Sequence, residues 1–361
     1  MIQNCTSNWE AGPHVTVDEQ LIPFRGRCIF RTYIANKPAK YGIKIFMAND
    51  SDTAYCINAI PYLGADSRQS SPEEMQGKSA GEYFTMKLIE PIVDTPGRTI
   101  CLDNWFTSLD LAKTLLSKGH HMVGTIRPKP YLPLMAVVDE QLAYGQSVAL
   151  YNHGHNVNIV YKRVKSKKYV AIMTTIHNHF TEVEISRAKG AKTEAHMFYN
   201  ACKGGTDSFD KMCALSSTHR KSNRWPLTVF YGLINIIMIN SWLVYKTNEN
   251  VSQDHGIFNY NLALYLCKPY AVYRYHTAGR FLTRELRMVM RQVFKNIDEA
   301  NEQVEAPLPP PVHGPQQPEE PPVLLVGPQP PVELEVLLVV VVHELGEEEE
   351  PRLVHWLHQY V

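Results

Sequence analysis

The sequence predicts an α/β protein in which helices flank a mixed sheet. Runs rich in aromatic and β-branched residues, separated by short turns, occupy much of residues 15–62 and are typical of an antiparallel meander. Helix and strand patterns then alternate, with a helix at 82–93, a strand at 98–102, a helix starting at Thr107 and a strand at 121–126. Strands that alternate with helices indicate a layered α/β architecture.

The rest of the chain divides by pattern and composition. Residues 127–196 are irregular and strand-rich, so we expect a β-rich insertion between two parts of a core at 1–126 and 197–300. The second part includes an amphipathic helix at 281–294. Residues 301–361 hold 12 of the 24 prolines together with acidic and Val/Leu runs, which predicts a low-complexity, disordered tail.

The net charge of zero conceals a strong asymmetry. Residues 301–361 carry 11 acidic residues and one basic residue, so residues 1–300 carry 35 basic and 25 acidic residues, a net charge of +10. A globular part with this excess suits a polyanionic partner, although many ordinary proteins are equally basic. The 361 residues are 44% hydrophobic, which supplies a real core and excludes wholesale disorder, collagen and a small disulfide scaffold.

Cysteine spacing and the N-terminus bear on the compartment. Of the seven cysteines the closest two, Cys202 and Cys213, are 11 residues apart, so the chain has no CxxC pair and no zinc-knuckle spacing. An odd number of scattered cysteines indicates free thiols in a reducing compartment. The first ten residues lack the charged and apolar regions of a signal peptide, so we do not expect secretion.

One apolar stretch has two interpretations. Residues 227–245 are 19 residues without a charge, about the length of a membrane span. Asn235 and Asn240 lie within it, and two amides near mid-span are costly in lipid. We therefore favour a buried core helix and expect no membrane partner, with a membrane-anchored protein as the alternative.

Four aspartates stand out by their placement. Asp18 ends or lies within the first strand, Asp103 ends the strand at 98–102, and Asp207 and Asp210 are three residues apart, on one face of a predicted helix. If these elements pack as a sheet with a flanking helix, the carboxylates converge, and convergent carboxylates suit a hard cation such as Mg²⁺ or Mn²⁺. Two such ions support in-line displacement at a phosphodiester.

Each aspartate alone also fits a structural role. An aspartate at a strand end is usually a turn or cap residue, and Asp207, after two glycines, equally fits a helix N-cap. Thr107 is expected to cap the helix after Asp103, with Asp110 completing an S/T-x-x-D box. Spacing alone leaves the catalytic and structural interpretations open.

A set of longer motifs carries a family resemblance. The chain contains Asp-Glu-Gln-Leu-Ile-Pro-Phe-Arg-Gly-Arg-Cys from residue 18, Asn-Lys-Pro-Ala-Lys-Tyr-Gly-Ile-Lys from residue 36 and Asp-Asn-Trp-Phe-Thr-Ser from residue 103. It continues with Gly-Gly-Thr-Asp from residue 204, Arg-Lys-Ser-Asn-Arg-Trp-Pro from residue 220 and Tyr-Gly-Leu-Ile-Asn from residue 231. In this order the motifs resemble those of piggyBac-type transposases and their host-derived relatives.

The resemblance implies a fold, a site and a partner. It implies an RNase H-like mixed sheet flanked by helices and interrupted by an insertion domain at 127–196. It implies a DDE/D site in which Asp18, Asp103 and Asp207 hold two Mg²⁺ or Mn²⁺ ions and Asp210 is an additional acid. Because such enzymes cut and join DNA at TTAA targets, it also implies DNA as the partner and a nuclear location, or otherwise a cytoplasmic one, and it leaves a homodimer open.

The sequence differs from the family pattern at both ends of the chain. Only 17 residues precede Asp18, and the family's Cys-rich, zinc-binding domain is replaced by the Pro/Val/Glu tail. We therefore expect a truncated transposase core that is not autonomously mobile and binds no zinc. The alternative is a domesticated, non-catalytic DNA- or chromatin-binding protein.

Basic and aromatic residues near the motifs are candidates for DNA contacts. The lysines at 165–168 fit either a phosphate contact or a nuclear-import patch. Each candidate also has a purely structural interpretation: structural pairing for the first two arginines, a solvated hairpin for the lysines and core packing for the tryptophan. The candidate nucleic-acid-binding residues are Arg25, Arg27, Lys165, Lys167, Lys168, Arg220, Lys221, Arg224 and Trp225.

Overall fold

The computed structural model describes residues 2–64, 77–127, 145–152, 154, 156–165, 168–177, 182–183, 192–248 and 254–277. The chain divides into two compact units, Met1–Ser252 and Gln253–Val361. Of the second unit, the described part is residue 254 and helix α9 (His255–Thr277). The helix expected at 281–294 and the tail expected at 301–361 lie outside the described residues.

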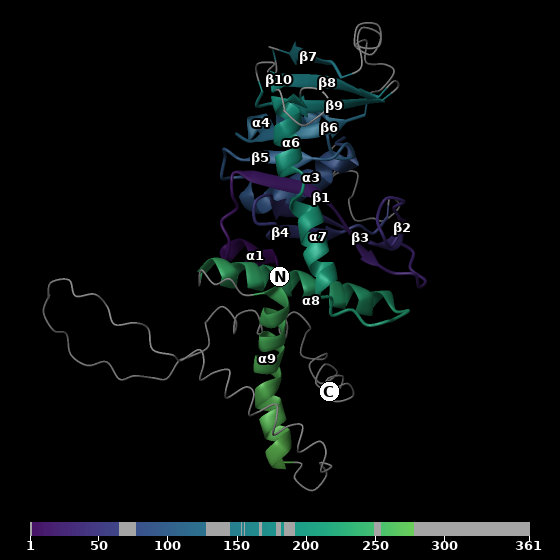
Figure 1. Cartoon of the computed structure of the whole chain (residues 1–361), viewed down its shortest axis with the longest axis vertical. Coiled ribbons are helices and arrows are strands. Elements are labelled where there is room, and N and C mark those ends of the chain that lie inside the picture. Colours follow the sequence, from purple (N-terminus) through teal and green to yellow (C-terminus); the bar gives the residue numbers. More distant parts are fainter. Residues whose placement is uncertain are drawn as a thin grey trace, which may run out of the picture. The chain divides into compact units, whose positions relative to one another are not determined.

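A mixed sheet is the centre of the first unit (Figure 1). Among the described residues its strands follow the order β2-β3-β1-β5-β6-β9-β8-β7, and β4 pairs with β3. The pairs β1–β5 and β5–β6 are parallel and the others are antiparallel, so the predicted mixed sheet is confirmed. The strands are β1 (His14–Pro23), β2 (Arg31–Tyr33), β3 (Tyr41–Asp50), β4 (Cys56–Pro61), β5 (Thr99–Leu102), β6 (His121–Ile126), β7 (Ser147–Asn152), β8 (Val157–Lys165) and β9 (Lys168–Thr174), with a separate ribbon of β10 (Glu182–Val183) and β11 (Lys192–Thr193).

The predicted antiparallel meander occupies the first half of this sheet. β1 pairs with β3 from Val15 opposite Asp50 to Pro23 opposite Gly42, and β3 pairs in turn with β2 and β4. Glycine is required at position 42, because a Cβ there would lie 2.3 Å from the carbonyl oxygen of Ile22. β3 is buried along most of its length, so its nearly continuous apolar run is that of a strand covered on both faces.

Helices precede and follow β5. α1 (Ile2–Ser7) starts the chain, α3 (Ala80–Ile89) and the 3₁₀ turn η1 (Glu90–Ile92) precede β5, and α4 (Leu109–Ser117) connects β5 to β6. The helix predicted at 82–93 stops earlier, since Pro91 lacks the backbone N–H that an α-helix would need there.

The start of α4 differs from the prediction by one residue. The hydroxyl of Ser108 accepts the backbone N–H of Leu111 at 3.1 Å and caps the helix. The predicted Thr107 cap is therefore wrong, because the Thr107 hydroxyl donates to the carbonyl oxygen of Asp103 in the preceding turn.

The strands within residues 127–196 extend the same sheet. β9 pairs antiparallel with β6, and β8 and β7 follow outward from it. Helix α6 (Glu194–Cys202) begins before residue 196 and crosses that predicted boundary. The described parts of this range are strand-rich, and its limits as an insertion domain stay a prediction.

Helices α6, α7 (Gly205–Leu215) and α8 (Trp225–Asn248) complete the first unit. α6 and α7 follow one another across one face of the sheet (Figure 1), and α7 contacts both β1 and β3. α8 contacts α7 and β1, with Pro226 in its first turn as predicted.

α8 contains the apolar stretch that the sequence left with two interpretations. Among the described residues it is the one helix long and apolar enough to cross a membrane, and 44% of its most apolar window is buried. The Asn240 amide accepts the N–H of Cys56 at 3.0 Å and donates to the carbonyl oxygen of Cys56 at 2.8 Å. Asn235 accepts the N–H of Thr218 at 2.9 Å. Both amides are bound within the protein, which favours the core-helix interpretation.

Replacing Asn240 by alanine should lower the free energy of unfolding by about 1–3 kcal/mol, because buried backbone groups of Cys56 lose their partner. Equilibrium urea unfolding of the full chain measures this change. Asn248→Ala, at the exposed end of the same helix, should change the free energy by less than about 0.5 kcal/mol. Equal stabilities of the two variants would contradict the structural role of Asn240.

Candidate functional site

Two of the predicted acids are neighbours on adjacent parallel strands. Val17 of β1 pairs with Leu102 of β5 at the last step of their shared register, and Asp18 and Asp103 are the next residues along the two strands. Asp103 is the first residue after β5, so the register brings the two acids to the same end of the strand pair, where the Asp103 carboxylate helps to raise the pKa of Asp18. Asp18 lies within its strand, because β1 continues to Pro23 against β3.

The backbone turn after β5 holds Asp103 in place. The Asp103 carboxylate accepts the N–H of Trp105, and its carbonyl oxygen accepts the hydroxyl of Thr107 at 2.7 Å and the N–H of Phe106 at 3.2 Å. Gly124 on β6 leaves room for the Thr107 hydroxyl, since a Cβ there would lie 2.2 Å from it. Thr107 therefore stabilises the turn that carries the acid.

Buried polar contacts hold the start of α7 against β1 and β3. Thr16 of β1 donates to the carbonyl oxygen of Cys202 at 2.6 Å, just before α7 begins. A Cβ on Gly205 would lie 2.8 Å from Thr16 Oγ1, so glycine lets the helix approach the strand this closely. Thr206 donates to Asn49 Oδ1 of β3 at 2.9 Å. These contacts place the first turn of α7 beside the strand of the first predicted acid.

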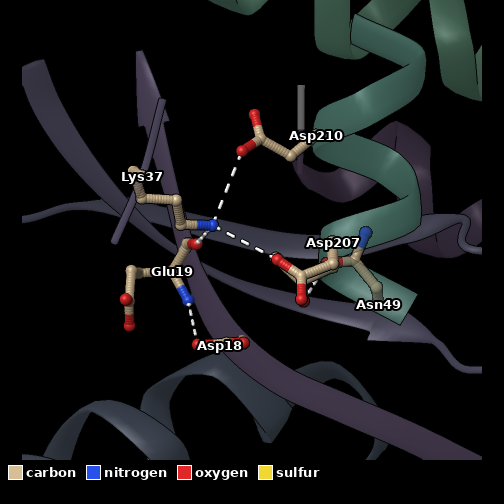
Figure 2. Close-up of polar contacts among 7 residues, drawn as sticks. Asp18, Glu19, Lys37, Asn49, Asp207 and Asp210 are labelled. Carbon is tan, nitrogen blue, oxygen red and sulfur yellow. Dashed lines mark hydrogen bonds and ion pairs between the residues drawn. The ribbon is translucent and has the colours of Figure 1, made fainter. Parts of the chain in front are cut away.

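The two acids of α7 share a partner (Figure 2). Lys37 Nζ lies 3.3 Å from Asp207 Oδ1 and 3.6 Å from Asp210 Oδ2, and it donates to the carbonyl oxygen of Glu19 at 3.1 Å. The predicted common face of Asp207 and Asp210 is therefore confirmed. Gly204 is the N-cap of α7, so the alternative in which Asp207 is the cap is wrong.

Lys37 is a site residue that the sequence pattern does not reveal. Its Asn-Lys-Pro context predicts a turn, and a turn pattern carries no information about which side chains the lysine meets. The partners Glu19 and Asp207 are 18 and 170 residues away in the sequence. Only the pairing of the strands and the docking of α7 bring them to the lysine.

Burial and charged neighbours shift the pKa values of Asp18, Asp210 and Lys37. Burial, the carboxylate of Glu19 and that of Asp103 raise the pKa of Asp18 to about 8, with burial the largest cause. Burial also raises the pKa of Asp210, against the lowering effect of Lys37. Burial lowers the pKa of Lys37, but the nearby aspartates outweigh it and the pKa is raised. The Lys37 ammonium lies close to two aspartates, so it offsets only part of their negative charge.

Carboxylate oxygens in this setting suit a hard divalent cation. Asp18 and Asp103 supply oxygen donors, and a bound cation would lower the raised pKa of the Asp18 carboxyl. In the described part of the chain, no group of three or more His, Cys, Asp or Glu side chains is arranged to hold a metal ion. Asp207 is 71% exposed and paired with Lys37. The donor chemistry of the strand aspartates fits Mg²⁺ or Mn²⁺, and the three-aspartate ligand set stays a prediction.

Two basic segments far apart in the sequence meet at the β2 edge of the sheet. The loop between β1 and β2 carries Arg25 and Arg27, and both are exposed. Gly26, between them, packs so closely that a Cβ would lie 2.7 Å from the carbonyl oxygen of Asn223. This contact joins the loop to the segment that precedes α8.

That second segment adds further charge and an aromatic ring. Arg220, Lys221 and Arg224 are exposed, and Trp225 is 40% exposed. The Trp225 ring meets the ring of Phe30 edge-on, with centroids 5.0 Å apart. The tryptophan is thus partly packed and partly accessible. Six of the predicted nucleic-acid-binding residues share this surface, which we call the basic surface: Arg25, Arg27, Arg220, Lys221, Arg224 and Trp225.

Arg31 holds the loop of the basic surface through backbone oxygen atoms. Its guanidinium donates to the carbonyl oxygens of Arg25 at 2.8 Å and Gly26 at 2.9 Å, and it lies 5.4 Å from the centre of the Tyr41 ring. The sequence shows Arg31 only as one more basic residue at a strand start, because its acceptors are backbone atoms that no residue pattern identifies.

The predicted hairpin lysines lie elsewhere on the sheet. Lys165 at the end of β8 and Lys168 at the start of β9 are exposed and pair with each other. In the strand order, β5 and β6 separate these strands from β1. Lys167 lies outside the described residues. The structure does not join these lysines to the basic surface.

Comparison with known proteins places the chain among transposases. Residues 1–242 match the sequence model of the family described as Transposase IS4. PiggyBac transposable element-derived protein 3 and the Chimeric ERCC6-PGBD3 protein, both of Homo sapiens, are each 22% identical over 259 residues, or 67% of this chain. The match covers 42% of the first protein and 23% of the second, so the chain spans less than half the length of these relatives.

A solved structure agrees with the same family. The cryo-EM structure described as a piggyBac transposase synaptic complex with hairpin DNA has a TM-score of 0.71 and 37% sequence identity to this chain. The match covers 81% of this chain and 59% of that one. The mixed sheet with flanking helices is therefore the fold of a piggyBac transposase.

In the metal-free protein, Asp18 should make the folded state less stable as pH rises. Its pKa is raised from 3.8 to about 8, so between these values the folded state retains a proton that the unfolded state releases, and stability falls with rising pH. Asp18→Asn should therefore show a smaller fall in unfolding temperature from about pH 5 to about pH 8 in EDTA.

The matched control for this measurement is Asp110→Asn, an exposed aspartate in the first turn of α4. It should keep the pH dependence of the unchanged protein. A pH dependence of Asp18→Asn identical to that of the unchanged protein would show that Asp18 titrates normally.

Proposed function

Because this chain belongs to the Transposase IS4 family and is a piggyBac-like member of it, we propose that it is the core of a metal-dependent enzyme that cleaves and joins DNA strands. The observation that supports this most is the placement of the acids. The β1–β5 register brings Asp18 and Asp103 to the same end of the strand pair. Lys37 contacts both α7 acids and the Glu19 carbonyl oxygen of β1. Asp103 helps to raise the pKa of Asp18, and the α7 acids and Asp18 raise the pKa of Lys37. These observations support a single acidic site formed by segments distant in the sequence, which two-ion phosphodiester chemistry requires.

Each acid has its own position in this proposal. Asp18 and Asp103 provide carboxylate ligands from adjacent strands, Asp207 provides one from α7, and Asp210 is an auxiliary acid. When bound, Mg²⁺ or Mn²⁺ supplies neutralisation of charge on the phosphoryl oxygens and activation of the attacking water or 3′-hydroxyl. The chain itself orients the Asp103 carboxylate through the N–H of Trp105 before any substrate arrives.

The basic surface supplies the DNA-holding part of the proposal. Exposed side chains such as Arg25, Arg27 and Arg224 offer positive charge to phosphates, and the accessible part of the Trp225 ring offers a face for a base. The matched piggyBac structure is described as a complex with hairpin DNA. We extend DNA as the partner, and the nucleus as the location, to this chain as part of the proposal.

A second candidate function is DNA or chromatin binding without catalysis. One observation favours it: Lys37 engages both Asp207 and Asp210, in place of a cation from solution. A protein that kept this pairing would bind DNA on its basic surface without cleaving either DNA strand. Measuring cleavage and binding on the same preparation separates the two functions.

Mg²⁺-dependent nicking should be lost in Asp103→Asn. With a supercoiled plasmid that contains TTAA sites, the rate of conversion to relaxed circles should fall about 100-fold or more, because a carboxylate ligand of the strand pair is removed. Asp110→Asn, on the exposed side of α4, should nick at the rate of the unchanged protein. Equal rates for Asp103→Asn and Asp110→Asn would exclude the catalytic role, and binding without any nicking would support the second function.

Removing two charges of the basic surface should weaken DNA binding in a salt-dependent way. The double variant Arg25→Ala/Arg27→Ala should reduce the slope of log affinity against log salt by about 1.8, since each lost phosphate contact contributes about 0.9. Fluorescence anisotropy with a labelled duplex over a salt series measures the slope. Lys118→Ala, exposed at the end of α4, is the matched control. An unchanged slope in the double variant would place the DNA elsewhere.

A further inference from the structure

The loop between β2 and β3 presents Lys37 in a prepared conformation. Within this loop the N–H of Ile34 donates to the carbonyl oxygen of Lys40 at 2.8 Å, and the N–H of Lys40 donates to that of Lys37 at 3.1 Å. Lys40 adopts a left-handed backbone conformation with φ of 57°, which closes the turn. The Lys37 side chain is 17% exposed, so the fold directs it inward.

The Lys37 ammonium connects a strand to a helix. It donates to the carbonyl oxygen of Glu19 on β1 and contacts one carboxylate oxygen each of Asp207 and Asp210 on α7 (Figure 2). Three oxygen atoms thus surround a group with three N–H donors. The lysine lies where the strand and helix that carry the acids come together.

The two carboxylates differ in how strongly the protein surrounds them. The side chain of Asp210 is 27% exposed, whereas that of Asp207 is 71% exposed. An exposed ion pair contributes little to stability, so Asp207 can leave the ammonium at small cost. Lys37 has two further partners, Asp210 and the Glu19 carbonyl oxygen, which do not depend on Asp207.

We propose that Lys37 is a positioning residue that occupies, in the metal-free protein, the place of a cation between the α7 acids and releases Asp207 when a divalent ion binds. The ammonium offsets the repulsion among the gathered carboxylates and keeps α7 docked on β1 before the ion arrives. The exchange of Asp207 rests on the proposed function, while the docking of α7 by Lys37 does not.

Thermal unfolding of the full chain, in EDTA and in saturating Mn²⁺, tests this proposal without measuring catalysis. Lys37→Met keeps the length of the side chain and removes its charge. In EDTA its unfolding midpoint should lie about 2–4 °C below that of the unchanged protein, the shift expected for a loss near 1 kcal/mol. Mn²⁺ should raise the midpoint of Lys37→Met more than that of the unchanged protein, because the ion then offsets repulsion that no ammonium offsets.

The matched control is Lys40→Met, which changes an exposed lysine in the same loop. It should behave as the unchanged protein does in both conditions. A Lys37→Met midpoint equal to that of the unchanged protein in EDTA would overturn the docking role. An equal rise with Mn²⁺ in all three proteins would overturn the exchange.

A second variant covers the case in which Lys37→Met does not fold. Lys37→Met/Asp207→Asn removes one charge of each sign and should recover part of the stability lost in Lys37→Met, since repulsion at α7 is relieved. No recovery would overturn the charge-compensation role. If Mn²⁺ raises no midpoint at all, the metal-dependent function fails, while a low midpoint of Lys37→Met in EDTA still supports the docking role.

Discussion

Repulsion between carboxylates on neighbouring elements is the constraint on which this site depends. The parallel register of β1 and β5 sets Asp18 next to Asp103, and α7 brings two more acids to the same strand. Burial makes the charged form of Asp18 costly, and its charged neighbours add to that cost. The ammonium of Lys37 compensates part of the negative charge of the α7 acids. Additional positive charge would relieve the repulsion that remains.

Polar contacts, in addition to apolar packing, determine where the acids lie. Thr16 and Thr206 make buried hydrogen bonds that hold the start of α7, and Gly205 lets the helix approach β1 closely. The Thr107 hydroxyl likewise holds the turn that carries Asp103, by donating to the Asp103 carbonyl oxygen. Hydrogen bonds have directional partners, so they set the positions of attached side chains more narrowly than apolar contacts do. The acids are therefore arranged before any ligand binds.

The acidic site and the basic surface have complementary tasks in the proposed reaction. A cluster of carboxylates repels DNA phosphates, so attraction for the substrate has to come from other residues and from bound cations. The basic surface joins the loop after β1 to the segment before α8, and Arg31 ties that loop to its neighbours through backbone oxygens. β1 therefore carries an acid within the strand and leads, at its end, into the loop that bears Arg25 and Arg27. This connection would relate the position of bound DNA to that of the acids.

The sequence by itself determined the alternation of strands and helices and the common face of Asp207 and Asp210, because these follow from periodicities of a few residues. It did not determine which hydroxyl caps α4, since Thr107 and Ser108 are adjacent and the local pattern fits both. The pairing of β9 with β6 and the contact between Lys37 and α7 were decided by the tertiary structure alone. Partners so distant along the chain meet only when strands pair and helices dock, and no local pattern encodes that meeting.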